Sequence, residues 1–148
     1  MLTIIVLGVL TVVNPFWGNK VTVFTNYYDN ATNTTKWYKY YIENCFLKSK
    51  RTAQTEGSNV QYILEWICRI PENETFLSYP EWAEDNIKEN HFCVNRGSII
   101  VKGLINDNIP DSDSGNKLLE KYKDNSFKVK SITENTDFML KHYNLTGN

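Results

Sequence analysis

The sequence has few of the side chains from which metal centres and active sites are built. Among its 148 residues are two histidines, His91 and His142, and three cysteines, none of which stands in a Cys-x-x-Cys pair. The absence of such a pair disfavours a structural zinc site. His91 and Cys93 would share one face of a strand, but a Cys–His nucleophile also needs an orienting group and an oxyanion hole, for which the sequence shows no motif. We therefore predict no metal, no cofactor, no catalytic residue and no enzymatic activity.

The chain also lacks an excess of charge of either sign. Its 16 Lys and Arg residues nearly balance its 17 Asp and Glu residues, which leaves a formal net charge of −1. Such a chain has no electrostatic field that would concentrate nucleic acid or an anionic membrane around it. We therefore predict no nucleic-acid partner, and a membrane association only if the apolar N-terminal segment remains uncleaved.

No apolar run in the sequence reaches the length of a membrane span. The N-terminal run covers residues 1–13 and is ended by Asn14 and Pro15. It matches the apolar region of a secretory signal peptide and falls short of the roughly 20 residues that cross a bilayer. We expect residues 1–18 to be a signal peptide and residues 19–148 to be a single secreted domain. An uncleaved membrane anchor and a buried N-terminal strand are the alternatives.

Secretion agrees with four acceptor sequons for N-glycosylation. They begin at Asn30, Asn33, Asn73 and Asn144. The composition also bears on the origin of the chain, because its 18 asparagines, and its 13 lysines against 3 arginines, follow the bias of AT-rich codons. This bias favours a large DNA virus or a parasite as the source.

Alternating apolar residues predict an antiparallel sheet that begins with residues 21–28. Residues 37–42 are ambiguous, because their aromatic side chains fit a strand by propensity and also fit a helical face; we favour the strand. The fold class that follows is α+β, with an antiparallel sheet built from hairpins and two or three short helices.

A hairpin over residues 45–68 is the strongest local signal. Glu56 and Gly57 can form its two-residue loop, because glycine supplies the positive φ that such turns need. That register places Cys45 directly opposite Cys68 on a mainly apolar face. In an oxidising compartment we expect these two to form a disulfide and Cys93 to remain free or to pair with another chain.

The C-terminal half is predicted to alternate between helices and hairpins. We expect a helix over 81–88, a hairpin of 91–94 with 98–105, a helix from 117 capped by Asp113 or Ser114, an edge strand over 127–130 and a last helix over 133–143.

Aromatic residues make up 14% of the chain and crowd into its first third. Tyrosine and tryptophan recur at binding surfaces because they combine a large contact area with a polar tip. We therefore consider a binding face formed by Trp37, Tyr38, Tyr40 and Tyr41, with Tyr38 and Tyr40 on one side of the strand and the other two on the opposite side. The predicted function is a secreted, N-glycosylated interaction module that binds an extracellular protein, such as a host protein, through an aromatic sheet face. The alternative is a secreted carrier of a small ligand or lipid, with an apolar pocket of the β-barrel type.

Export is directly testable. Protein recovered from the culture medium should begin near Asn19, because residues 1–18 are removed, and its gel mobility should increase when N-glycans are cleaved off. Recovery only from the cytosol, with Met1 at the N-terminus and no glycan, would contradict secretion.

Overall fold

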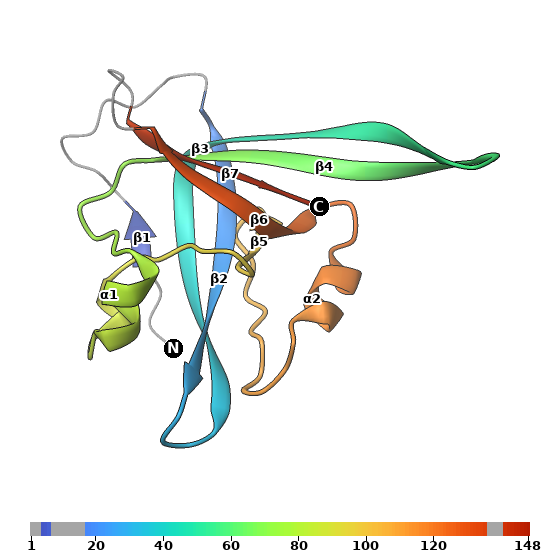
Figure 1. The fold of residues 1–148 in the computed structure, drawn as a ribbon. Coiled ribbons are helices and arrows are strands. Elements are labelled where there is room, and N and C mark those ends of the chain that lie inside the picture. The colour runs from blue at the N-terminus through green and yellow to red at the C-terminus, as the bar shows by residue number, and fades with distance from the viewer. Residues whose placement is uncertain (1–3, 7–16, 136–140) are drawn as a thin grey trace.

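The computed structural model describes residues 4–6, 17–135 and 141–148. Strands make up 54% of these residues and helices 12%, so the fold is largely β. The strands are β1 (Ile4–Val6), β2 (Asn19–Asp29), β3 (Thr34–Glu56), β4 (Asn59–Pro71), β5 (Ile99–Lys102), β6 (Ser126–Asn135) and β7 (His142–Gly147); the helices are α1 (Tyr79–Glu84) and α2 (Asn116–Lys121), with a 3-10 turn, η1 (Lys88–Asn90). The predicted antiparallel sheet is confirmed, with two short α-helices in its connections (Figure 1).

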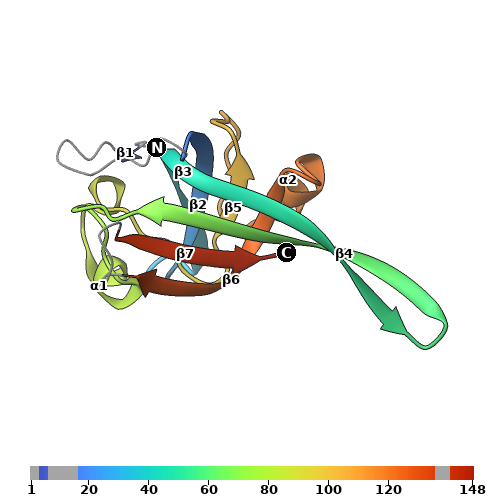
Figure 2. The ribbon, with the colours of Figure 1, turned by 90° about the horizontal axis from the view of Figure 1, so that it is seen from above.

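The six strands β2 to β7 pair antiparallel in a closed ring. β2 pairs with β3, β3 with β4, β4 with β7, β7 with β6, β6 with β5, and β5 with β2. The first half of β3 pairs with β2 and its second half with β4, so β3 belongs to two sheets. Likewise, the first part of β6 pairs with β5 and the rest pairs with β7, so β6 also belongs to both sheets. The first sheet, around β2 and β5, and the second sheet, around β4 and β7, therefore cross at a steep angle and are joined at two corners (Figure 1, Figure 2).

Backbone irregularities mark both corners. In β3, Asn44 has a φ of 58°, in the left-handed region that asparagine tolerates, and the pairing of β2 with β3 shifts between Asn19 and Val21 beside it. In β6, Lys130 is the extra residue of a bulge, since Val129 pairs with Gly147 whereas Ser131 pairs with Thr146. Bulges bend a strand and increase its twist, which lets β3 and β6 pass from one sheet to the other.

Two apolar clusters bury the two faces of the first sheet. The cluster inside the ring includes Tyr40, Phe92 and Trp66, and Trp66 stacks on Phe127 with ring centroids 5.6 Å apart. The other lies under α2 and comprises Phe24, Trp37, Ile99, Val101, Ile109 and Leu118. Because β5 has apolar neighbours on both faces, its side chains at positions 99–101 are all buried and do not alternate.

The hairpin between β3 and β4 forms, but the predicted register is wrong by two residues. Glu56 pairs with Asn59, so Gly57 and Ser58 are the loop, and Gly57 has a φ of 65° at the first loop position. A type II′ turn requires glycine at that first position, whereas the predicted loop placed it second. Every side chain keeps its face, because the shift is an even number of residues. Cys68, however, lies opposite Leu47 and not opposite Cys45.

The predicted helix over 133–143 is wrong where the structure describes it. β6 continues to Asn135 and β7 begins at His142, while residues 136–140 lie outside the described residues. Tyr143 and Leu145 alternate inward toward the core of the ring, which long-range pairing with β4 and β6 imposes. The predicted edge strand over 127–130 is also wrong in one respect, because β6 pairs on both sides.

The predicted hairpin of 91–94 with 98–105 is wrong as well. Phe92 makes an isolated parallel bridge with Phe76, and only Ile99–Lys102 forms a strand, which pairs with β2 and β6. The predicted helix over 81–88 is present as α1, which ends earlier, at Glu84.

The second predicted helix is present as α2, but its cap differs. Gly115, with a φ of 82°, precedes the helix in place of Asp113 or Ser114. At that positive φ any side chain would be strained, and a Cβ atom would also displace Ile99 Cδ1, so glycine fits this position best. Asp113 instead accepts a hydrogen bond from the Gly115 amide at 2.8 Å.

The N-terminal strand β1 pairs parallel with β3 along Tyr40, Tyr41 and Ile42. The segment predicted to be a signal peptide thus contributes three residues at the edge of the first sheet. Within the described residues, no helix is long and apolar enough to cross a membrane.

Gly147 offers a test of the corner at β6. Replacing it with alanine would place a Cβ atom 2.0 Å from the Lys128 carbonyl oxygen, so the two strands would have to separate. We expect Gly147→Ala to lower the free energy of unfolding by roughly 2–3 kcal/mol in urea denaturation. Asn148→Ala, at the exposed neighbouring position, should change it by less than about 0.5 kcal/mol. Equal stability of the two variants would contradict the close approach.

Candidate functional site

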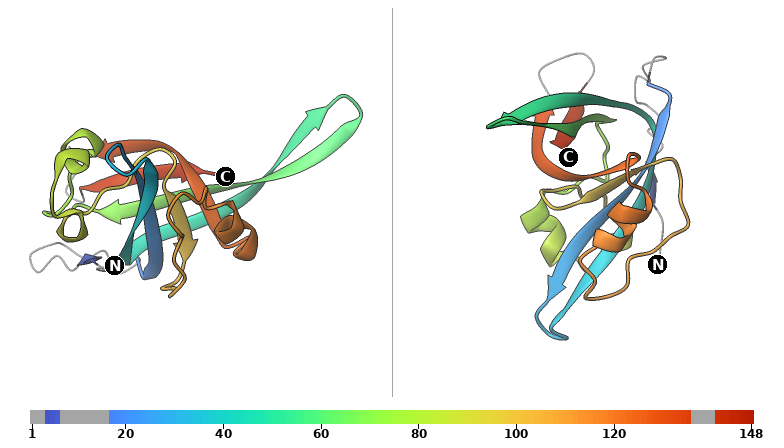
Figure 3. Two further views of the ribbon diagram at one scale, coloured as in Figure 1. Left: turned by 90° about the horizontal axis from the view of Figure 1, so that it is seen from below. Right: turned by 90° about the vertical axis from the view of Figure 1, so that its right-hand side faces the viewer.

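A two-stranded arm projects from the ring. The pairing of β2 with β3 ends at Cys45, and the pairing of β7 with β4 begins at Trp66, so residues 51–64 pair only with each other. We call residues 51–64 the arm; it extends well past the rest of the molecule (Figure 1, Figure 3). Both outer edges of the arm lack a strand partner among the described residues.

One face of the arm continues the apolar lining of the core. Side chains two apart in a strand share a face, so Trp66, Leu64, Tyr62 and Val60 form one row along β4. Trp66 is buried and Leu64 is half-buried, whereas Tyr62 is 71% exposed and Val60 is 52% exposed. The row therefore begins inside the ring and ends in solvent. A contiguous exposed apolar patch is a candidate interaction surface.

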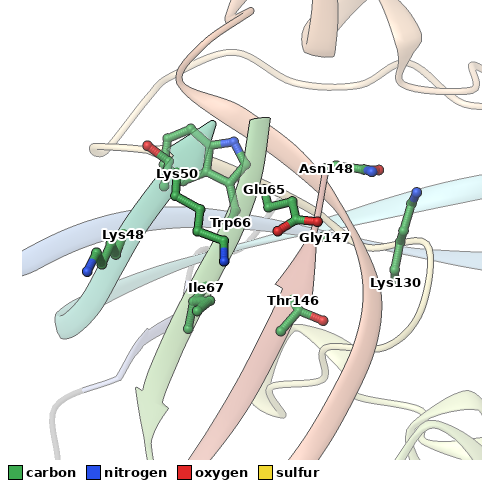
Figure 4. Close-up of a pocket in the computed structure, with 10 residues that line it drawn as sticks. Lys48, Lys50, Glu65, Trp66, Ile67, Lys130, Thr146, Gly147 and Asn148 are labelled. Atoms are coloured by element: carbon green, nitrogen blue, oxygen red, sulfur yellow. The ribbon is translucent and has the colours of Figure 1, made fainter. Parts of the chain in front are cut away.

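A pocket of about 530 Å³ opens at the base of the arm, against β6 and β7. It is lined by Lys48, Ser49, Lys50, Glu65, Trp66, Ile67, Lys130, Thr146, Gly147 and Asn148. In Figure 4, Lys48 and Lys130 lie on opposite sides of the pocket, with Lys50, Glu65 and Thr146 between them. The Thr52 hydroxyl donates a hydrogen bond to Glu65 at 3.1 Å. None of the three lysines forms an ion pair with a carboxylate of the described residues.

The four aromatic residues predicted as a binding face are not gathered on one surface. As expected from strand periodicity, Tyr38 and Tyr40 pack on the cluster inside the ring and Trp37 belongs to the cluster under α2. Trp37 is 4% exposed and Tyr40 is fully buried. Tyr41 is half-buried and donates a hydrogen bond to the Ile105 carbonyl at 2.6 Å. Two of the four side chains are therefore buried and two are half-buried, because later segments of the chain cover much of both sides of the first sheet.

Part of this covering is made by α1 and η1, through an aromatic cluster around Trp82. The Trp82 indole donates to the Tyr40 hydroxyl, which in turn donates to the Lys88 carbonyl, each at 3.0 Å. The Lys88 ammonium lies 4.3 Å from the centroid of the Tyr27 ring, a cation–π contact. Burial raises the pKa of Tyr40 well above its usual value. Sequence reasoning had no signal for this cluster, since α1 and η1 are remote in sequence from β2 and β3.

The four sequons occupy different environments. Asn30 and Asn33 are both exposed in the turn between β2 and β3. The Asn73 side-chain nitrogen and the Thr75 hydroxyl are buried without a hydrogen-bond partner among the described residues. Asn144 lies within β7, with its side-chain oxygen buried. Accessibility therefore favours a glycan at Asn30 over one at Asn73.

The three cysteines are buried and carry free thiols. Cys45 and Cys68 are diagonal neighbours on the inner face, and a hydrogen bond between their side chains, together with burial, raises the pKa of Cys68 well above its usual value. Burial raises the pKa of Cys93 to about 12. At neutral pH Cys93 is therefore a protonated thiol and a poor nucleophile.

Two titratable side chains, those of His91 and Asp85, meet just after α1. His91 Nδ1 contacts the Asp85 carboxylate, whose pKa is lowered chiefly by a hydrogen bond from the backbone amide of Ile87 and further by His91. Within the described ranges, no three His, Cys, Asp or Glu side chains are placed to hold a metal ion.

The fold and these surfaces define a closed antiparallel β domain with a projecting arm and a basic pocket at its base. Residues 16–148 match a protein family described as a family of unknown function (DUF6751), and the chain belongs to that family. No curated protein and no solved structure matches it.

The environments of the sequons predict unequal glycan occupancy. In protein secreted from insect or mammalian cells, Asn30→Gln should lower the apparent mass on a gel by that of one glycan, because Asn30 is exposed. Asn73→Gln should leave mobility unchanged, because a glycan on the buried nitrogen would displace its surroundings. Full occupancy of Asn73 in folded protein, seen by mass spectrometry of its glycopeptide, would contradict this ranking.

Proposed function

We propose that this chain is a secreted, N-glycosylated interaction module that binds an extracellular protein through the arm. The observation that carries this proposal is the apolar row that leaves the core and ends in solvent at Tyr62 and Val60. A viral or parasitic source would make a host protein the partner. The binding face proposed here therefore lies on the arm and not on β3, where we predicted it from the sequence.

The arm offers a partner both main-chain and side-chain contacts. Its outer edges expose backbone amides and carbonyls that a strand of the partner can pair with, as in β-augmentation. Tyr62 adds a large ring with few rotatable bonds, a side chain of the type that dominates binding energies. Arg51, opposite Leu64, supplies the charge on this face.

Secretion is supported by the apolar run over residues 1–13 and by the exposed sequon at Asn30. The family match begins at residue 16, so most of the predicted signal peptide lies outside the matched region. These observations agree with an extracellular partner.

The alternative function, a carrier of a small ligand, has a different basis. The interior of the ring is filled by Val21, Tyr40, Ile42, Trp66, Phe92 and Phe127. A small ligand would therefore have to bind in the pocket at the base of the arm. The lysines of this pocket favour an anionic ligand over an apolar lipid.

Substitution of Tyr62 tests the arm. Tyr62→Ser should reduce a partner's affinity by about 2 kcal/mol or more, while the free energy of unfolding changes by less than about 1 kcal/mol, because the side chain is exposed. The partner is first captured by cross-linking native secreted protein to a mixture of extracellular proteins, and its affinity is then measured by surface plasmon resonance.

Tyr28→Ser is the matched control, because Tyr28 is also exposed, at 52%, but lies near the end of β2, in the hairpin that β2 forms with β3. It should retain the affinity of the native protein. Equal affinities of native protein and both variants for every captured protein would refute binding through the arm.

A further inference from the structure

We propose that the pocket at the base of the arm binds an acidic saccharide, meaning a sugar that carries a sulfate or a carboxylate group. Its volume of about 530 Å³ falls within the range of small-ligand sites. This proposal goes beyond the binding of a protein by the arm and depends neither on that partner nor on secretion.

The charges of the pocket favour an anion. Three lysines line it against one acidic side chain, that of Glu65, although the whole chain has a net charge of −1. The basic groups are thus concentrated locally and are not a consequence of composition. Because the three ammonium groups form no ion pairs with described residues, they are available to an oxyanion.

The remaining lining residues favour a sugar over a bare anion. Glu65 would repel an inorganic anion, but its carboxylate can accept hydrogen bonds from sugar hydroxyls, as can the side chains of Thr146 and Ser49. Figure 4 shows Glu65 and Thr146 between the flanking lysines, with Ile67 beside them as an apolar surface for a sugar ring. A sulfate or phosphate ion would leave these groups without a role.

The pocket is built on rigid elements. All of its residues but Asn148 come from β3, β4, β6 and β7, and Lys130 is placed by the bulge at the corner of β6. Paired strands fix the backbone positions from which these side chains project, so the backbone of the site need not be ordered when a ligand binds.

Titration of isotope-labelled full chain by NMR tests this site. The probes are 6-sulfated N-acetyllactosamine, sialyllactose, neutral N-acetyllactosamine and inorganic sulfate. We expect at least one acidic sugar to shift the amide resonances of Ile67, Thr146 and Gly147, with an affinity that falls as salt is added. The neutral sugar should cause no shift, and inorganic sulfate should bind at least tenfold more weakly than the acidic sugar.

Paired charge variants provide the control. Lys50→Gln with Lys130→Gln should weaken the acidic sugar about tenfold, whereas Lys102→Gln with Lys117→Gln, which removes the same charge at exposed positions outside the pocket, should change its affinity less than twofold. Glu65→Gln should strengthen the binding of sulfate, because a repulsive charge is lost. The absence of shifts with both acidic sugars, equal weakening by the two double variants, or sulfate binding as tightly as sugar would each overturn the proposal.

Discussion

The closure of the sheet through β3 and β6 is the constraint on which the rest of the structure depends. β3 is the longest strand, with 23 residues, whereas β2 has 11 and β7 has 6. Because the corner at Asn44 turns β3 away from β2, its second half is free to pair with β4. Beyond the last pair of β4 with β7, no third strand is present in the described chain, and the hairpin continues alone. The arm is therefore a direct consequence of unequal strand lengths around a closed ring.

The same closure places the pocket. Its lining residues come from four segments, around positions 49, 66, 130 and 147, which meet only because β4 and β6 both pair with β7. The bulge that lets β6 change sheets also displaces Lys130, and the absence of a side chain at Gly147 permits the close approach of β6. The residues that close the ring are thus the ones that shape the pocket. A change that opened the corner would alter stability and the pocket together.

Local sequence signals predicted the elements whose residues interact with near neighbours. The strand at 21–28, the hairpin around Gly57 and the start of α1 near Pro80 follow from alternation, turn chemistry and proline, and all are present. Long-range pairing decided the rest. The residues near Tyr143 fit a helical pattern in the sequence, but in the structure they form a strand because β4 and β6 flank them. No local motif connects the four segments that line the pocket. The register failed because only the turn type distinguishes two registers that give the same faces.

Burial and exposure together are the reason that we propose the arm, and not the aromatic segment of β3, as the recognition element. The rings of Trp37 and Tyr40 are packed in the two apolar clusters, and their polar atoms donate internal hydrogen bonds. Tyr62 and Val60 are exposed, although they continue the same apolar row as Trp66. An isolated two-stranded hairpin is only marginally stable in water, but here β3 and β4 anchor it at its base. The backbone pairs of the arm are therefore formed before any partner arrives, so a partner that covers this face gains buried area without ordering the arm.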